Sequence, residues 1–325
     1  MIHWILMIAV LILSFVLLVK GADFFVDGCV SIAKILHVPN LVIGLTIVAM
    51  GTSAPEAAVS ISGAVSNPDN AGITVGNLLG SNLLNILIIL GVSAILVPII
   101  VEPSLLKKDF PLLIGSAVIV PILFWTGHMK GTRLGGIILL IFFLVFMIWT
   151  IQNAMKSRKK SLESNTDDTG NEKPFSILKS VIYAVGGLAV VILGGQLAVY
   201  SAKDIAHGIG ISESLIGLTV VALGTSLPEL ITSVVSARKG NSDLALGNVI
   251  GSNLFNILFV MGLSMLIAPF SIKMEDIIDS LCVLAVSILC YIFAATRKKI
   301  GKIEGLILLL VYGVYLTYII SRDIM

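Results

Sequence analysis

The sequence contains few of the residues that build disulfide frameworks, zinc sites or catalytic centres. Its 325 residues include three cysteines and four histidines, and charged residues make up only 12%. The cysteines are Cys29, Cys282 and Cys290. Because they lie in apolar stretches without metal-ligand spacing, we expect neither a disulfide framework nor a zinc site. The sequence has no HExxH motif and no recognisable nucleophile–base pair, so it does not predict an enzyme.

Polar stretches long enough to form a soluble domain are also missing. Hydrophobic residues make up 57% of the chain, and the mean hydropathy is +1.06. Apolar runs of about 20 residues recur, and each can cross a hydrocarbon core of ~30 Å. The first run, residues 5–19, has no cleavage-site pattern after it, so we expect a retained helix rather than a signal peptide. The sequence therefore predicts an all-α, multi-pass protein of the cell membrane.

The apolar runs predict ten membrane-spanning helices. They lie near residues 3–34, 40–66, 70–98, 109–127, 132–151, 176–206, 212–237, 242–268, 276–295 and 303–321. The polar stretch at 152–174 has the composition of a flexible linker. It divides the chain into a first five-helix repeat, residues 1–151, and a second five-helix repeat, residues 175–325.

The distribution of lysine and arginine predicts the orientation. When loops are assigned to alternate sides, fifteen of these residues lie on the side of the linker and five on the other. Positively charged loops tend to remain in the cytoplasm. We therefore expect a cytoplasmic linker and extracellular termini. Because each half has an odd number of spans, the halves would be inverted relative to each other.

Two sequence strings occur once in each half. Residues 44–53 (GLTIVAMGTS) match 217–226 (GLTVVALGTS) at eight of ten positions. Residues 76–87 (GNLLGSNLLNIL) match 247–258 (GNVIGSNLFNIL) at nine of twelve. Inverted repeats whose helices are broken near the membrane midplane are typical of secondary transporters.

A carboxylate lies beside an expected helix break in each copy. The strings are GTSAPE at 51–56 and GTSLPE at 224–229. Proline lacks an amide hydrogen and interrupts helical hydrogen bonding. A charged group at the bilayer centre costs roughly 2.5–3.5 kcal/mol on insertion scales, so the duplicated Glu56 and Glu229 indicate a function.

The residues around the breaks offer oxygen ligands. Besides the two glutamates, the candidates are the hydroxyls of Thr52, Ser53, Thr225, Ser226, Ser81 and Ser252, the amides of Asn85 and Asn256, and carbonyls near Ala49 and Ala222. Such a set covers the six to eight oxygens that calcium prefers, and it also suits sodium. Zinc and copper are disfavoured because no His or Cys cluster is present.

Structural roles compete with several of these assignments. The glutamates could join helices, and Asn85 and Asn256 could form hydrogen bonds between helices. Asn77 and Asn248 could either assist packing or support ligands. Separately, Lys20, Asp23 and Asp27 share a helix face, where we expect them to neutralise one another.

At these repeated motifs the sequence resembles the cation/calcium antiporter superfamily, and within it the prokaryotic sodium/calcium exchangers. The resemblance implies that Glu56 and Glu229 bind calcium together with Thr52 and Thr225. It also implies that flanking sodium sites are lined by Ser53, Ser226, Ser81, Ser252 and the carbonyls of Ala49 and Ala222. In the family the first and sixth spans, here 3–34 and 176–206, slide across a fixed core.

The resemblance implies an antiporter that exchanges sodium for calcium by alternating access, with calcium export driven by sodium entry. A Thr-Ser pair in both motifs resembles sodium-coupled members, and Asn256 replaces an Asp of potassium-dependent ones. A proton/calcium antiporter is an alternative, and a cation channel is a more distant one. The expected partners are calcium ions, sodium ions and the lipid bilayer. We expect no cofactor, nucleic acid or obligatory protein partner.

Overall fold

The structure is a computed structural model that describes residues 2–66, 72–164, 174–208 and 222–324. Within these ranges, eight helices are long and apolar enough to cross a membrane, and a bent pair at Asn40–Thr52 and Ala54–Val65 adds a ninth. The expected span near 212–237 is described only from residue 222 onward, so the ten-helix count stays a prediction. The long uninterrupted helices are α1 (Ile2–Leu36), α8 (Asp109–Thr126), α9 (Arg133–Ser164), α10 (Ile177–Gly208), α16 (Met274–Arg297) and α17 (Lys302–Ile324).

The interrupted helices are those that carry the repeated strings. In the first half they are α2 (Asn40–Ile43), η1 (Gly44–Val48), α3 (Ala49–Thr52), α4 (Ala54–Ser66), α5 (Gly72–Leu84), η3 (Asn85–Ile89) and α6 (Leu90–Leu96). In the second half they are α12 (Ala222–Thr225), α13 (Leu227–Arg238), α14 (Ser242–Leu254), η5 (Phe255–Met261) and α15 (Gly262–Ile267). The η segments are π-helical, a geometry often found at functional sites.

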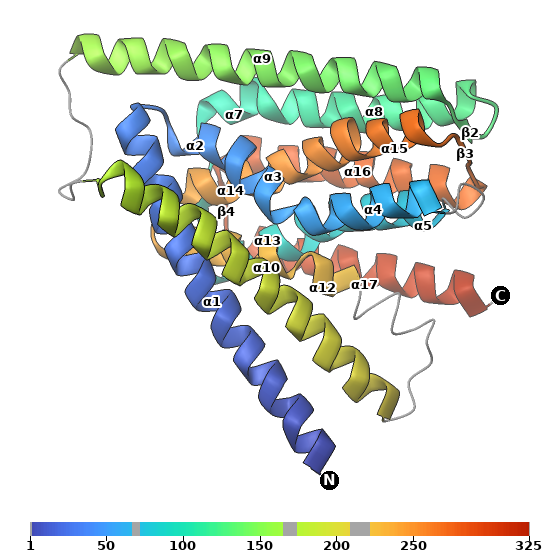
Figure 1. Cartoon of the computed structure of the whole chain (residues 1–325). Helices are drawn as coiled ribbons and strands as arrows, with labels where there is room; N and C mark the ends of the chain where they lie inside the picture. Colours follow the sequence, from blue (N-terminus) through green and yellow to red (C-terminus); the bar gives the residue numbers. More distant parts are fainter. Residues whose placement is uncertain (1, 67–71, 165–173, 209–221, 325) are drawn as a thin grey trace.

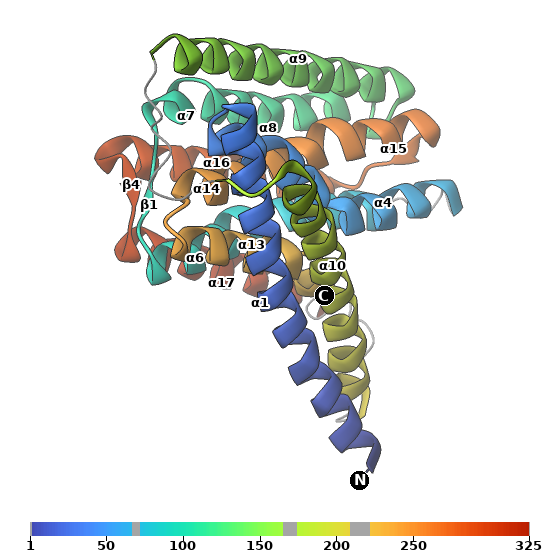
Figure 2. The ribbon, with the colours of Figure 1, turned by 60° about the vertical axis from the view of Figure 1, so that its left-hand side comes forward.

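Helices α1 and α10 run side by side and extend away from the other helices (Figures 1 and 2). Glycines allow their backbones to touch. A β-carbon at Gly28 would collide with the backbone of Ala184, and one at Gly187 would collide with the backbone of Phe25. Small residues at helix crossings permit this close approach in membranes. The first described helix of each half, α1 and α10, therefore packs closely against the other.

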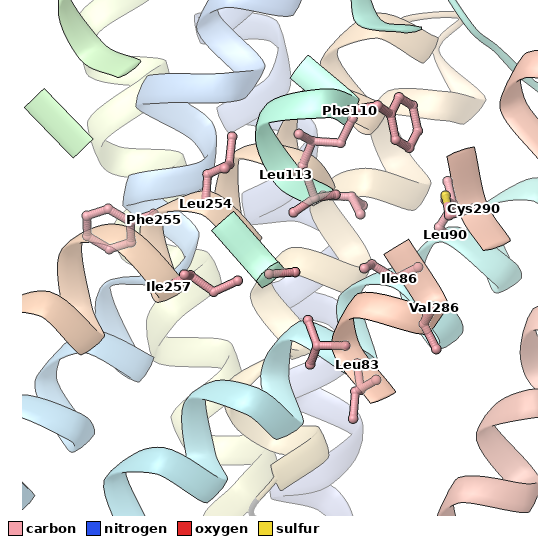
Figure 3. Packing of buried hydrophobic residues seen from close by; sticks show 14 of the residues in the cluster. Leu83, Ile86, Leu90, Phe110, Leu113, Leu254, Phe255, Ile257, Val286 and Cys290 are labelled. Carbon is pink, nitrogen blue, oxygen red and sulfur yellow. The ribbon is translucent and has the colours of Figure 1, made fainter. Parts of the chain in front are cut away.

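The main apolar core joins the two halves. Leu83, Ile86 and Leu90 of the first half lie in one cluster with Leu254 and Val286 of the second (Figure 3). Phe110 and Leu113 of α8 belong to the same cluster. The halves are therefore packed against each other along their interrupted helices, which places their polar residues at a shared centre.

Two short strand pairs also connect the halves. β1 (Ile99–Ile100) follows α6 and pairs with β4 (Lys299–Ile300), between α16 and α17. β3 (Phe270–Ser271) follows α15 and pairs with β2 (Lys130–Gly131), between α8 and α9. The second pair lies at the upper right of the bundle in Figure 1. The sequence did not predict these strands, because two residues carry no recognisable period.

The helix α9 extends beyond its expected end. It continues to Ser164, so residues 152–164 of the expected linker are helical. This stretch includes Gln152, Ala154, Met155 and Lys156, which favour helix. The flexible linker expected over 152–174 is therefore wrong for residues 152–164; residues 165–173 lie outside the described residues. A short helix, α7 (Pro103–Lys107), also precedes α8.

Candidate ion-binding site

Each repeat has a one-residue helix break, and the helix that follows carries proline and glutamate at its second and third positions. Ser53 separates α3 from α4 with φ −82° and ψ 7°, and Ser226 separates α12 from α13 with φ −91° and ψ 4°. Both breaks occur where the sequence predicted them. Glu56 and Glu229 lie in the first turns of α4 and α13, where unpaired amides and the helix dipole favour a negative charge.

The two breaks meet inside the protein. Ser53 Oγ donates a hydrogen bond of 2.9 Å to Glu229 Oε1, and Ser226 Oγ donates one of 3.2 Å to Glu56 Oε1. The carboxylates are buried, with 1% of Glu56 and 2% of Glu229 exposed. They are also close enough to interact electrostatically. Each half therefore provides a carboxylate that is hydrogen-bonded by the other half.

One oxygen of each carboxylate is left without a partner. Glu56 Oε2 and Glu229 Oε2 are buried and accept no hydrogen bond from the described residues. A buried acceptor that forfeits its hydrogen bond costs roughly 1–3 kcal/mol, and more when it is charged. A bound cation would remove this cost and the repulsion between the carboxylates. The site therefore has the electrostatic character of a cation site.

The threonines lie at the same centre. Thr52 is completely buried; its hydroxyl is 3.2 Å from Asn248 Oδ1 and also lies beside Glu229. The Thr225 hydroxyl lies beside Glu56 in the same way. The structure thus brings Thr52 and Thr225 to the carboxylates of the opposite halves.

The carbonyl of Ala49 is shared between the halves. It accepts a hydrogen bond of 3.0 Å from the Ser53 amide and lies 3.5 Å from Ser252 Oγ of α14. Ser252 and Ser81 are both buried. Ala222 is the first described residue of α12, and its side chain lies outside the described part of the chain. Ala49 and Ser252 are therefore directly adjacent.

Asparagine amides lie on the helices that pack against those of the glutamates, with Asn85 on η3 against α13 and Asn256 on η5 against α4. Asn85 Nδ2 donates a hydrogen bond of 3.1 Å to Asn253 Oδ1, so Asn85 does join helices of the two halves. Its own Oδ1 has no partner among the described residues, and neither amide atom of Asn256 or Asn82 has one. Buried amides normally have partners. Asn85 therefore has the helix-joining role that the sequence left open, and its Oδ1 is left as a buried acceptor.

Asn77 and Asn248 support the helices that carry the glutamates. Asn77 Nδ2 donates to Ser60 Oγ at 3.0 Å, and Asn248 Nδ2 donates to Ser233 Oγ at 2.9 Å. Each serine lies one helical turn after the glutamate of its half. The structure therefore assigns these asparagines a positioning role.

Sequence reasoning overlooked four of these residues: Asn82, Asn253, Ser60 and Ser233. The first two belong to the repeated GSN string, so repetition could have identified them. The serines lie four residues after each glutamate, a spacing that places them on the same helix face. Repetition at equivalent positions was the available signal in both cases.

Comparisons with known proteins show the family of this chain. The family model described as sodium/calcium exchanger protein matches residues 6–152 and 179–321. The chain belongs to the sodium/calcium exchanger family. This membership confirms the resemblance to cation/calcium antiporters. It also confirms the prediction that the chain is a multi-pass membrane protein.

Relatives in this family match nearly the whole chain. The putative antiporter CaxA of Alkalimonas amylolytica is 39% identical over 93% of this chain and 94% of its own length. The sodium/calcium exchanger MaX1 of Methanosarcina acetivorans is 34% identical over 94% of this chain and 96% of its own. A solved structure of the sodium-calcium exchanger NCX_Mj, soaked with sodium and strontium, has a TM-score of 0.82 at 33% identity and covers 97% of this chain and 99% of that one.

Proposed function

We propose that this protein is an antiporter that exchanges sodium for calcium across the membrane. The observation that carries the proposal is the reciprocal pair Ser53–Glu229 and Ser226–Glu56. It gathers two carboxylates at the junction of the halves, each with an oxygen that has no hydrogen-bond partner among the described residues. Family membership and the names of the relatives support the choice of ions.

We propose that calcium binds between Glu56 and Glu229, with Thr52 and Thr225 beside it. Sodium ions compete for the same carboxylates from flanking positions. The oxygens at those positions belong to Ser53, Ser226, Ser81, Ser252, Asn85, Asn256 and the carbonyls of Ala49 and Ala222. The buried amide oxygens of Asn85 and Asn256 support this assignment, because they have no partner within the described part of the chain and are available as acceptors. The protein needs no catalytic residue and no cofactor.

Competition for shared carboxylates explains why the protein exchanges ions rather than leaking them. An empty site buries two charged groups that are not neutralised, and the desolvation penalty of such groups is several kcal/mol per ion. Bound calcium or sodium removes the penalty and allows the site to change its access from one side to the other. Sodium normally runs inward, so the working direction is calcium export.

The proposed architecture is a pair of inverted five-helix repeats in the cell membrane. The equivalent breaks at Ser53 and Ser226 support it, as do the equivalent strand pairs that follow α6 and α15. The central linker is cytoplasmic and both termini are extracellular. The carboxylates lie near the membrane midplane.

Proteoliposomes test the function directly. Vesicles loaded with sodium and diluted into sodium-free buffer at fixed pH take up radioactive calcium if sodium is the counter-ion. Uptake under a proton gradient without sodium would instead identify a proton/calcium antiporter. Calcium movement with no counter-ion would identify a channel and contradict the proposal.

A further inference from the structure

Helix α13 carries Glu229 and contacts α1 through its opposite face. Leu227, Ile231 and Val235, spaced four residues apart, pack in one apolar cluster with residues of α1 such as Phe25 and Val26. The next position at this spacing is Lys239, immediately after the end of α13. The apolar contact between the helices therefore ends in a cation.

Lys239 meets two carboxylates of α1. Its Nζ lies 2.7 Å from Asp27 Oδ1 and 3.4 Å from Asp23 Oδ1, and it donates a hydrogen bond of 3.0 Å to the Asp23 carbonyl. We call Lys239, Asp23 and Asp27 the Lys239 ion cluster. The sequence suggested that the aspartates are neutralised by Lys20 on their own helix, whereas the structure pairs them with a cation of the second half.

The cluster links the α1–α10 pair to the helix of the ion site. Other polar contacts act within the pair, since His3 contacts Asp204 and Ser31 contacts Ser180. With backbones in direct contact at their glycines, α1 and α10 shift together more readily than they separate. The Lys239 ion cluster is therefore a polar contact between this pair and the end of α13.

The polar face of α13 leads from Glu229 toward Lys239. Thr232, Ser233 and Ser236 follow Glu229 at helical spacing, and all three are buried. Thr232 Oγ1 and Ser236 Oγ have no hydrogen-bond partner among the described residues. Such hydroxyls could bind water molecules if this face of α13 became a hydrated path in another state of the protein. In the present state all three side chains are closed off from solvent.

Building on the proposed function, we propose that Lys239 is a positioning residue of the transport cycle. Paired with Asp23 and Asp27, it holds α1 in the register that closes the path along α13. The aspartates are four residues apart, or about 6 Å along the helix axis. Because Lys239 contacts both carboxylates, a displacement of α1 by about one turn, like known one-turn helix shifts, keeps one of them at Lys239 and removes the other. When the displacement carries the amino-terminal part of α1 toward Lys239, Lys20 also approaches Lys239, and the like charges repel.

The cluster is expected to act on position and not on folding. The Lys239 side chain is 28% exposed, and those of Asp23 and Asp27 are 35% and 42% exposed. Ion pairs with this exposure contribute little to stability. We therefore expect substitutions in the cluster to leave the melting temperature nearly unchanged. A role in folding would lower the melting temperature, whereas the proposed role changes access to the path.

The test uses the full chain in proteoliposomes with a Ser236→Cys reporter. A charged methanethiosulfonate reagent is applied to each side, and the parent without the reporter gives the background from native cysteines. Lys239→Gln and Asp27→Asn are expected to raise reporter labelling at least three-fold from the Lys239 side and to slow exchange. Asp27→Lys combined with Lys239→Asp is expected to restore both. Arg238→Gln, at the adjacent exposed cation, is the matched control.

The outcomes separate the two proposals. The positioning role would be overturned if Lys239→Gln showed the same labelling and exchange as Arg238→Gln. It would also be overturned if the double variant showed no better closure or exchange than Asp27→Asn. If Lys239→Gln does not fold, Asp27→Asn and the double variant decide the question. If the unmodified protein does not exchange sodium for calcium, the proposed function is wrong, while labelling still shows whether the cluster closes the path.

Discussion

Ser53 donates its hydroxyl hydrogen to Glu229, a residue 176 positions further along the chain. Ser226 does the same for Glu56, 170 positions earlier. Each hydroxyl thereby reduces the desolvation cost of a carboxylate that belongs to the other half. Neither half alone contains this arrangement, so the site exists only when both are folded together.

Glutamine at either carboxylate is expected to abolish exchange. Glu56→Gln or Glu229→Gln removes the charge that neutralises a cation while leaving a similar shape. Removing one partner of a buried charge pair costs roughly 3–5 kcal/mol, so we expect flux to fall on the order of 100-fold or more. Radioactive calcium uptake in proteoliposomes measures it, and Glu102→Gln serves as a control outside the site. Near-normal flux in a folded glutamate variant would refute the site assignment.

Alanine at the reciprocal serines is expected to weaken ion binding by similar amounts in the two halves. Ser53→Ala and Ser226→Ala each remove a hydrogen bond to a charged group, worth about 1.5–3 kcal/mol. We expect the apparent sodium affinity to fall roughly 10- to 100-fold. Sodium titrations of calcium uptake provide the measurement. The buried Ser287, whose hydroxyl donates to a carbonyl of its own helix, is the matched alanine control; equal effects there would contradict the prediction.

Asn248 is expected to contribute more to thermal stability and to calcium binding than its counterpart Asn77. Asn248 is fully buried and lies between Ser233, Thr52 and the Glu229 carbonyl, while Asn77 is partly buried and contacts Ser60. Leaving buried polar partners unpaired costs about 1–3 kcal/mol. We expect Asn248→Ala to lower the melting temperature and to reduce stabilisation by added calcium more than Asn77→Ala. Thermal unfolding in detergent, with and without calcium, compares them; a larger effect at Asn77 would argue against this assignment.

The packing of α1 against α10 is testable at two adjacent glycines. Gly187→Ala places a methyl group against the backbone of Phe25, whereas a methyl group at Gly186 meets nothing within 4 Å. Overpacking of a tight contact costs typically 1–3 kcal/mol. We expect Gly187→Ala to lower the melting temperature and Gly186→Ala to leave it nearly unchanged. Equal melting temperatures would show that the helices are not in backbone contact.

Much of the site could be predicted from the sequence because its residues are repeated. The GTS-x-PE string identified both helix breaks and both glutamates, since proline and a membrane-embedded carboxylate have strong local consequences. Apolar runs of helix length located most of the spans, because the length of such a run is itself a local signal. Two-residue strands and the helical extension to Ser164 have weaker local signals and were not found.

Pairing between distant residues had no signal in the sequence. Asp23 and Asp27 illustrate this limit, because their helical spacing to Lys20 suggested a partner on the same helix. The observed partner, Lys239, lies more than 200 residues away. Likewise, nothing in the strings showed that Asn85 bonds to Asn253 rather than to its own counterpart, Asn256.

The sequence by itself determined that the chain crosses a membrane and carries two equivalent breaks with oxygen-rich residues. These properties follow from apolar length, proline and charge, all of which act over a few residues. Only the tertiary structure decided which oxygens face each other, which remain unpartnered, and which cation holds α1 against α13. Those relationships depend on how two halves pack, and packing depends on shape complementarity between helices that are distant in the chain.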